Sequence, residues 1–221
     1  DGPVDTSAPE LAGANITDKS RCTVNSDNES KTHATAIASL LVSKNYGLLP
    51  DATLYSYQTS FRDQEPSADC NPETGTALDK LGALINFAIN DGAQIITISI
   101  AAGQIDAKFE PVLNAALSRA INQGIIVVTG MGNTSTDNDG GSYASRNGFV
   151  GVSAVNLDGS FALDYSSFGD SVTTAAFGGP IKVRDYDKGN IGDMRGTSIA
   201  TPIVAASLAL ARQKWPDATS N

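Results

Sequence analysis

The stretch Gly196-Thr197-Ser198-Ile199-Ala200-Thr201-Pro202 decides how this chain is interpreted, because a glycine-led turn there leads directly into a helix of small and apolar residues. After the turn, apolar residues recur at helical spacing, namely Val204, Ala205, Leu208 and Ala209. One face of the helix is therefore buried, which fixes the end that carries Ser198. A serine at this place most often caps the helix. It is also a candidate nucleophile, because the partial positive charge of a helix N-terminus stabilises a developing oxyanion.

A general base and an orienting carboxylate for such a nucleophile have few possible sources. The chain holds a single histidine, His33, and the small and aliphatic residues 34–41 after it predict a closely packed helix. Imidazole is the usual base that activates a serine near neutral pH, although a lone histidine is more often a solvated surface group. The segment Asp1–Leu11 supplies a carboxylate at a turn. A serine, a histidine and a carboxylate are therefore available together.

Strand-like and helix-like segments alternate along the chain. The expected strands are Ala52–Tyr57, Gln94–Ile100, Ile125–Thr129, Phe149–Val155 and Val172–Ala176, and the expected helices between them are Thr76–Asn90 and Ala107–Asn122. This alternation predicts an α/β fold with right-handed crossovers and a mostly parallel sheet covered by helices on both faces. In such sheets, function gathers at the carboxyl ends of strands and the N-termini of helices.

Four segments, taken in chain order, resemble the conserved boxes of the subtilases, which are the subtilisin family of serine proteases. The segments are Asp1–Leu11 for the catalytic aspartate, His33–Ser39 for the histidine box, Gly130–Asn133 for the strand end that delivers the oxyanion asparagine, and Gly196–Pro202 for the serine box. The order aspartate, histidine, serine is the one known for subtilisin itself. The resemblance implies a three-layer subtilisin-like fold and a single catalytic domain over residues 1–221.

The same resemblance implies an acyl-transfer mechanism with four catalytic groups. Ser198 would attack the peptide carbonyl, His33 would take its proton and pass it to the leaving amine, and Asp1 would hold the imidazole in the useful tautomer. Asn133 would donate its side-chain amide to the oxyanion, together with the backbone N–H of Ser198.

Substrate-binding residues are also implied by the resemblance. In subtilases an extended peptide adds as a strand beside the segment equivalent to Ser99, Ile100, Ala101 and Ala102, a pairing that reads backbone more than side chains. Alanines stand at 101 and 102 where the family usually has glycines, and their methyl groups narrow the expected groove. Gly130, Gly132 and Ser142 match positions that line the pocket for the residue before the cleaved bond. Their small size predicts a roomy pocket, and no acidic residue marks it as selective for basic side chains.

Composition excludes several classes of function. The 221 residues are 41% hydrophobic and 18% charged, which suits one soluble domain with a sizeable core. A formal charge of −9 argues against nucleic acid as a partner. No apolar run is long enough for a membrane span.

Cys22 and Cys70 lie in polar segments without metal-type spacing, so they form either an extracellular disulfide or two free thiols. We expect an extracellular protein.

Two further expectations follow from departures from the family pattern. Only Lys44–Gly47 connect the histidine helix to the next segment, which is too short for the family's calcium loop, so we expect no metal there and no cofactor. Glu10 matches one ligand of that site and is equally interpreted as a surface residue. Subtilase chains continue before the aspartate and beyond the position of Asn221, so we expect a longer protein, with a propeptide as a possible partner.

Three functions remain open at this level. An active endopeptidase that acts on extended peptides is favoured, because all four catalytic groups are of the types that the chemistry needs. A catalytically impaired binding module is the second hypothesis, motivated by the altered glycines and the missing flanks. The third is a peptide-precursor processing protease or macrocyclase, because Asp1–Asp5 resembles the start of the cyanobactin-processing subtilases.

Overall fold

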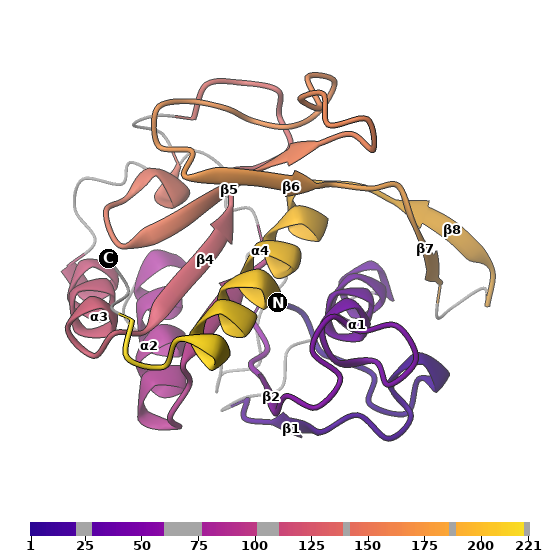
Figure 1. Cartoon of the computed structure of the whole chain (residues 1–221), viewed down its shortest axis with the longest axis horizontal. Coiled ribbons are helices and arrows are strands. Elements are labelled where there is room, and N and C mark those ends of the chain that lie inside the picture. Colours follow the sequence, from indigo (N-terminus) through magenta and orange to yellow (C-terminus); the bar gives the residue numbers. More distant parts are fainter. Residues whose placement is uncertain (21–27, 60–76, 101–110, 139–141, 186–188, 219–221) are drawn as a thin grey trace. The chain divides into compact units, whose positions relative to one another are not determined.

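The computed structural model of the chain describes residues 1–20, 28–59, 77–100, 111–138, 142–185 and 189–218 (Figure 1). The chain divides into two compact units. The first unit comprises Asp1–Thr74 and Pro180–Met194, and the second comprises Gly75–Gly179 and Arg195–Asn221. Each unit is therefore formed from segments that lie far apart in the sequence.

The second unit is built on a parallel sheet of four strands. The strands β3 (Ile95–Ile98), β4 (Ile126–Gly130), β5 (Phe149–Val155) and β6 (Thr174–Phe177) lie side by side in chain order. The register places Ile95 of β3 opposite Ile126 of β4, and Val127 of β4 opposite Phe149 of β5. All three pairings are parallel, so the carboxyl ends of the four strands meet at one edge of the sheet.

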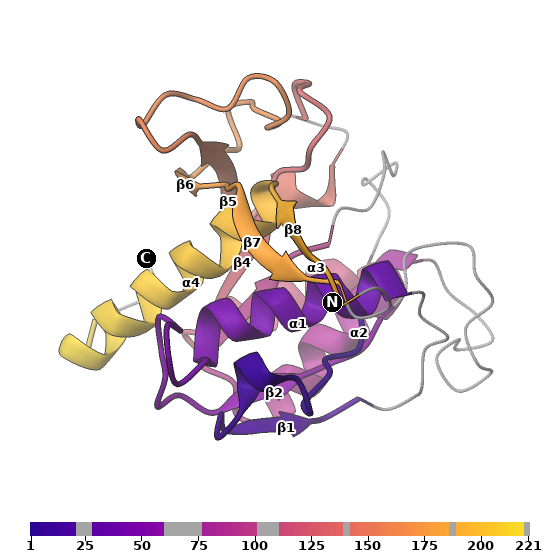
Figure 2. The same ribbon diagram turned by 90° about the vertical axis from the view of Figure 1, so that its right-hand side faces the viewer.

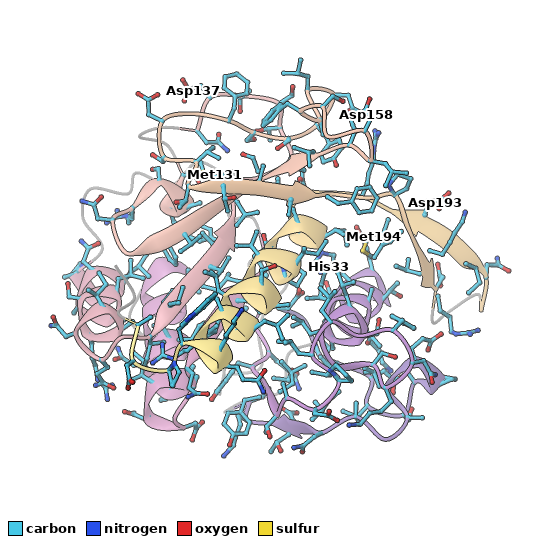
Figure 3. The ribbon with its side chains drawn as sticks, viewed as in Figure 1. His33, Met131, Asp137, Asp158, Asp193 and Met194 are labelled. Carbon is cyan, nitrogen blue, oxygen red and sulfur yellow. The ribbon has the colours of Figure 1, made fainter. Side chains whose placement is uncertain are left out.

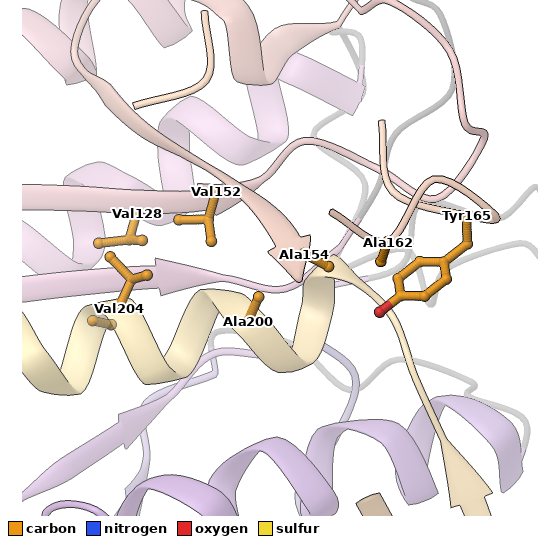
Figure 4. Packing of buried hydrophobic residues seen from close by; sticks show 8 residues of the cluster. Val128, Val152, Ala154, Ala162, Tyr165, Ala200 and Val204 are labelled. Atoms are coloured by element: carbon orange, nitrogen blue, oxygen red, sulfur yellow. The ribbon is translucent and has the colours of Figure 1, made fainter. Parts of the chain in front are cut away.

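Helices cover this sheet on both faces. Helix α4 (Thr197–Lys214) contacts all four strands (Figure 1), whereas α3 (Pro111–Asn122) contacts β4 and packs on α2 (Ala77–Asn90). Figure 4 shows the interior beneath α4, where strand residues meet small helix residues; the cluster comprises Val128, Val152, Ala154, Ala162, Tyr165, Ala200, Val204 and Ala205. Small side chains on the helix let it lie close to the strands, which places its first turn at their carboxyl ends.

The first unit carries helix α1 and four short strands (Figure 2). Strands β1 (Ile16–Asp18) and β2 (Leu54–Ser56) pair in parallel, while β7 (Ile181–Arg184) and β8 (Ile191–Met194) form an antiparallel hairpin. Helix α1 (Asn28–Val42) contacts β7 and the 3-10 turn η1 (Pro9–Leu11). Arg184 Nε donates to Glu10 Oε1 over 2.7 Å. This ion pair ties the hairpin to the turn that precedes β1.

The expected α/β fold with a mostly parallel, helix-covered sheet is confirmed. The strand Phe149–Val155 is placed as expected, and the other expected strands differ at their ends by one or two residues. The hairpin β7–β8 was not expected, although Ile181–Arg184 alternates apolar and polar residues; its partner strand Ile191–Met194 does not alternate. No helix in the part of the chain that the structure describes is long and apolar enough to cross a membrane.

Close packing of α2 on α3 generates a stability prediction at Gly82. A Cβ at Gly82 would lie 2.8 Å from Leu113 N and 2.8 Å from Val112 C, so Gly82→Ala forces the two helix backbones apart. We expect an overpacking cost of about 3 kcal/mol to outweigh the gain of about 1 kcal/mol in helix propensity. The urea unfolding midpoint should therefore fall, corresponding to a net loss of about 2 kcal/mol.

The matched control is Gly192→Ala, because nothing lies within 4 Å of the added methyl group at Gly192. This variant should unfold close to the midpoint of the unaltered protein. An increase in stability for Gly82→Ala would contradict the close helix approach.

Candidate active site

The first unit brings together His33 and Asp1, the expected base and its carboxylate. The imidazole Nδ1 lies 3.1 Å from Asp1 Oδ1 and 3.0 Å from Asp1 Oδ2. The backbone N–H of Gly2 donates to Asp1 Oδ1 over 2.7 Å, which fixes the carboxylate from the other side. With Nδ1 donating to the carboxylate, the neutral ring carries its lone pair on Nε2. His33 is therefore in the tautomer that a general base for a serine requires.

The segment that carries Asp1 is held against the first turns of α1. Thr35 Oγ1 accepts the backbone N–H of Asp5 over 2.9 Å and donates to Lys31 O over 2.7 Å. Lys31 Nζ lies 3.3 Å from Asp5 Oδ2. A Cβ at Gly2 would lie 2.7 Å from Ser30 O, so only glycine lets the chain approach the helix this closely. These contacts set the position of Asp1 relative to His33 (labelled in Figure 3).

Burial is the main cause that lowers the pKa of His33 to about 4, and the charge of Glu29 opposes the shift. The side chain keeps 25% of its surface exposed, so the ring is mostly shielded from water. Desolvation favours the neutral imidazole, because a charged ring in this buried place would lack the hydration that it has in water. The base is therefore neutral throughout the physiological range of pH.

The second unit holds Ser198 in the first turn of α4, where the residue is 8% exposed. The N-cap position is occupied by Gly196, which has a φ of 155° that side chains rarely adopt. The interpretation of Ser198 as the helix cap is therefore wrong, and its hydroxyl is available for another role. A Cβ at Gly196 would lie 2.9 Å from Asn133 Nδ2 and 3.1 Å from Ser198 Oγ. The amide nitrogen and the hydroxyl oxygen thus both lie close to one backbone position that has no side chain.

The carboxamide of Asn133 is oriented by Thr197. The backbone N–H and the hydroxyl of Thr197 both donate to Asn133 Oδ1, over 2.8 Å and 3.1 Å. The carbonyl end of the amide is occupied in this way, and Nδ2 is the end nearer to the Cβ position of Gly196, at 2.9 Å against 3.3 Å for Oδ1. Thr197 Oγ1 also accepts the backbone N–H of Gly132 over 3.2 Å. An amide donor and a serine hydroxyl held at one helix N-terminus form an arrangement that can stabilise an oxyanion.

The expected substrate-binding residues fall into different environments. Ser99 is buried directly after β3, and the carbonyl of Ile100 accepts the Tyr143 hydroxyl. Ser142 caps the 3-10 turn η4 (Tyr143–Ser145), since its hydroxyl accepts the N–H of Ala144 over 3.1 Å. Burial raises the pKa of the Tyr143 phenol to about 12, so this hydroxyl remains a donor.

The two glycines expected in the pocket also have structural roles. A Cβ at Gly130 would lie 2.8 Å from Thr197 Oγ1, and Gly132 has a φ of 104°. Both therefore shape the junction of β4 and α4. Ala101 and Ala102 lie outside the described residues, as do Cys22 and Cys70. The part that Ser99, Ile100, Gly130, Gly132 and Ser142 play in binding a peptide stays a prediction.

In the region after α1, oxygen atoms that could face a metal ion are bound by a lysine side chain. Lys44 Nζ donates to Pro50 O over 2.6 Å and to Asp51 Oδ1 over 3.0 Å. Glu10 is engaged by Arg184. Among the residues that the structure describes, no group of three or more His, Cys, Asp or Glu side chains is placed to hold a metal ion.

Two positioning groups were not expected from the sequence, although they stand inside quoted motifs. Thr35 follows His33 by two residues, and Thr197 directly precedes Ser198. Their closeness to these residues in the motifs is the sequence feature that could have identified them. Their hydrogen bonds to Asp5 and Asn133 depend on contacts between distant segments, which motif spacing does not encode.

A family sequence profile, described as the subtilase family, matches residues 1–221. The chain belongs to the subtilase family. Among curated relatives, this subtilase is 30% identical over 201 residues to a thermostable alkaline protease of Halalkalibacterium halodurans, covering 88% of this chain and 50% of that protein. It is 26% identical over 197 residues to subtilisin BL of Lederbergia lenta, covering 86% of this chain and 66% of that protein. The chain thus spans about half the length of the first of these relatives.

Solved structures show the same fold. The subtilase superimposes on the patellamide maturation protease PatA with a TM-score of 0.77 and 25% identity, covering 100% of this chain and 79% of that one. It also superimposes on the prenylagaramide maturation protease PagA with a TM-score of 0.78 and 23% identity, covering 99% and 76%. The expected subtilisin-like fold is confirmed by these structures.

Because His33 is the only histidine of the chain, its titration can be followed without ambiguity. We expect the imidazole resonance in proton NMR spectra of the folded protein to titrate well below 6.5, with a midpoint near the lowered pKa of about 4. The unfolded state binds the proton at higher pH than the folded state. The stability that the neutral ring contributes should therefore be lost as pH falls from about 6.5 to about 4.

The control for this titration is the urea-unfolded chain, whose histidine should titrate at its ordinary pKa near 6.5. A folded-state midpoint at or above 6.5 would contradict the burial of the ring.

Proposed function

We propose that this subtilase is a serine endopeptidase that cleaves peptide bonds through an acyl-enzyme on Ser198. The observation that carries the proposal is that Ser198 Oγ and Asn133 Nδ2 both lie next to Gly196, within 3.1 Å of the position that a Cβ there would take. A hydroxyl nucleophile and an amide donor for the oxyanion are thus oriented together at a helix N-terminus. The Asp1 and His33 pair supports the proposal from the first unit, because it presents a neutral base with its tautomer set.

Acylation proceeds in two steps. Ser198 Oγ forms a bond to the scissile carbonyl carbon, while His33 Nε2 takes the hydroxyl proton and the carbonyl π electrons move to oxygen. The resulting oxyanion accepts hydrogen bonds from Asn133 Nδ2 and from the backbone N–H of Ser198. When the tetrahedral intermediate collapses, the carbon–nitrogen bond breaks and His33 gives its proton to the leaving amine.

Deacylation repeats the sequence with water as the nucleophile. His33 takes a proton from water as the water oxygen bonds to the acyl carbon. Collapse of the second tetrahedral intermediate releases the carboxylic acid product, and the Ser198 oxygen recovers its proton from His33. Asp1 stays ionised and stabilises the imidazolium that forms in each half of the reaction.

The substrate in this proposal is a peptide or protein segment in an extended conformation, bound beside Ser99–Ala102 as an added strand. We further propose that residues 1–221 act as one catalytic domain, that the protein works outside the cell, and that a propeptide is one of its partners. The curated relatives support this setting, because one is named a minor extracellular protease, from Bacillus subtilis.

A second candidate function is maturation of a dedicated precursor peptide. The structural likeness to PatA, whose title names it a patellamide maturation protease, favours it. The start of the chain, Asp1–Asp5, is the sequence feature that agrees with it. In this case the acyl-enzyme would be cleaved by water, or by the amino end of the same peptide to give a ring.

Labelling with a fluorophosphonate probe tests the proposed nucleophile. The probe phosphonylates an activated serine with loss of fluoride, so we expect one adduct per chain and its location on Ser198 by peptide mass spectrometry. Ser198→Ala should abolish the labelling, and His33→Ala should slow it at least about 100-fold because the general base is lost.

The matched control for this labelling is Ser207→Ala, because Ser207 is an exposed serine on the same helix that donates to Ile203 O. This variant should label at the rate of the unaltered chain. Absence of labelling in the unaltered chain would favour the catalytically impaired binding module instead.

Product analysis separates the two candidate functions. Incubation with an unfolded protein such as reduced casein should give many linear fragments if the chain is a general endopeptidase. Cleavage confined to one or a few sites, or cyclic products from a precursor-like peptide, would instead support maturation.

A further inference from the structure

The loop that carries Asn133 is held on both sides by one residue. The backbone N–H of Ser167 donates to Gly132 O over 2.9 Å, and Ser167 Oγ accepts the N–H of Thr134 over 3.3 Å. The Thr134 and Ser167 hydroxyl oxygens also lie 3.0 Å apart. The two peptide groups that flank Asn133 are therefore both bonded to Ser167.

Ser167 is itself fixed to the central sheet. Its side chain is fully buried, and its carbonyl accepts the hydroxyl of Ser153 on β5 over 2.8 Å. The hydroxyl of the neighbouring Ser166 accepts the N–H of Ala154, also on β5, over 2.8 Å. Ser153 and Ser166 are fully buried as well. Hydrogen bonds in such a dry interior are strong and leave little freedom to the groups that they join.

We infer that Ser167 is a positioning residue for the oxyanion donor, transmitting the rigidity of β5 to the backbone on both sides of Asn133. The inference rests on the proposed function. Thr197 fixes the carboxamide of Asn133, and Ser167 fixes the backbone from which that carboxamide projects. Both are needed, because an oxyanion donor is effective only when it is held in place before the charge develops.

The energetic role of Ser167 differs from that of Asn133. Loss of the donor itself costs about 100- to 1,000-fold in kcat, a magnitude known from subtilisin, a member of this family. Removal of the Ser167 hydroxyl leaves the Asn133 carboxamide present, but it breaks the hydrogen bond that holds the backbone N–H of Thr134. We therefore expect Ser167→Ala to lower kcat about 10-fold and to change KM less than about 2-fold, because the affected interaction forms only in the transition state.

A double-mutant cycle tests the inference on the full chain with a peptide p-nitroanilide that the unaltered enzyme hydrolyses. In the Asn133→Ala background, Ser167→Ala should change kcat less than about 2-fold, because the donor that it positions is gone. An equal loss of kcat in both backgrounds would overturn the inference, since the serine would then act on something other than Asn133. Unchanged kcat in the single variant would also overturn it.

The matched control is Ser43→Ala. Ser43 is equally buried and its hydroxyl accepts one backbone N–H, that of Asn45, over 3.4 Å. Both serine variants should lower the thermal midpoint, but only Ser167→Ala should lower kcat. If Ser167→Ala does not fold, Ser153→Ala removes the shorter of the two hydroxyl hydrogen bonds to Ser167 O, at 2.8 Å against 3.2 Å from Ser166, and should show the same dependence on Asn133.

Failure of the inference is distinguishable from failure of the proposed function. If the unaltered chain neither hydrolyses peptides nor reacts with fluorophosphonate, the proposed function is wrong and the inference falls with it. If the unaltered chain is active and the serine effect persists without Asn133, only the inference is wrong.

Discussion

The close approach of the N-terminus of α4 to the end of β4 is the constraint on which the chemistry of the second unit depends. Gly130 has no side chain, so the Thr197 hydroxyl reaches a place that a Cβ would fill. From there Thr197 bonds to Gly132 N and to Asn133 Oδ1. The start of α4 and the end of β4 are thereby held together, and the proposed nucleophile Ser198 and the proposed oxyanion donor Asn133 come from opposite sides of that junction.

The first unit has a similar arrangement, in which a threonine hydroxyl on α1 joins two chain segments. Thr35, on the helix of His33, accepts a backbone N–H from the segment that carries Asp1 and donates to a carbonyl of its own helix. In each unit a buried threonine hydroxyl therefore joins two chain segments next to a reacting group. Glycine permits the approach in both cases, at Gly2 and at Gly130. A threonine hydroxyl suits this role because it donates and accepts at once, and its branched side chain has little rotational freedom.

Much of this arrangement was predictable from the sequence, for physical reasons that differ between elements. The buried strand β5 and helix α4 have long apolar patterns, so their type and place follow from periodicity. His33, Asn133 and Ser198 stand in motifs whose residue types are dictated by acyl transfer. The hairpin β7–β8 was missed because its sequence signal is short: Ile181–Arg184 alternates apolar and polar residues over only four positions, and Ile191–Met194 does not alternate. Ser167 was missed because its role arises from hydrogen bonds to residues more than thirty positions away, which no local motif signals.

The central proposal is that His33 with Asp1 and Ser198 with Asn133 take part in one acyl-transfer reaction. A peptidyl chloromethyl ketone tests this most directly, because such a reagent must first engage the serine before its methylene carbon alkylates the histidine. Mass spectrometry of the treated chain should find alkylated His33, and Ser198→Ala should abolish the alkylation. Alkylation that is absent from the unaltered chain, or that persists without the Ser198 hydroxyl, would contradict the claim.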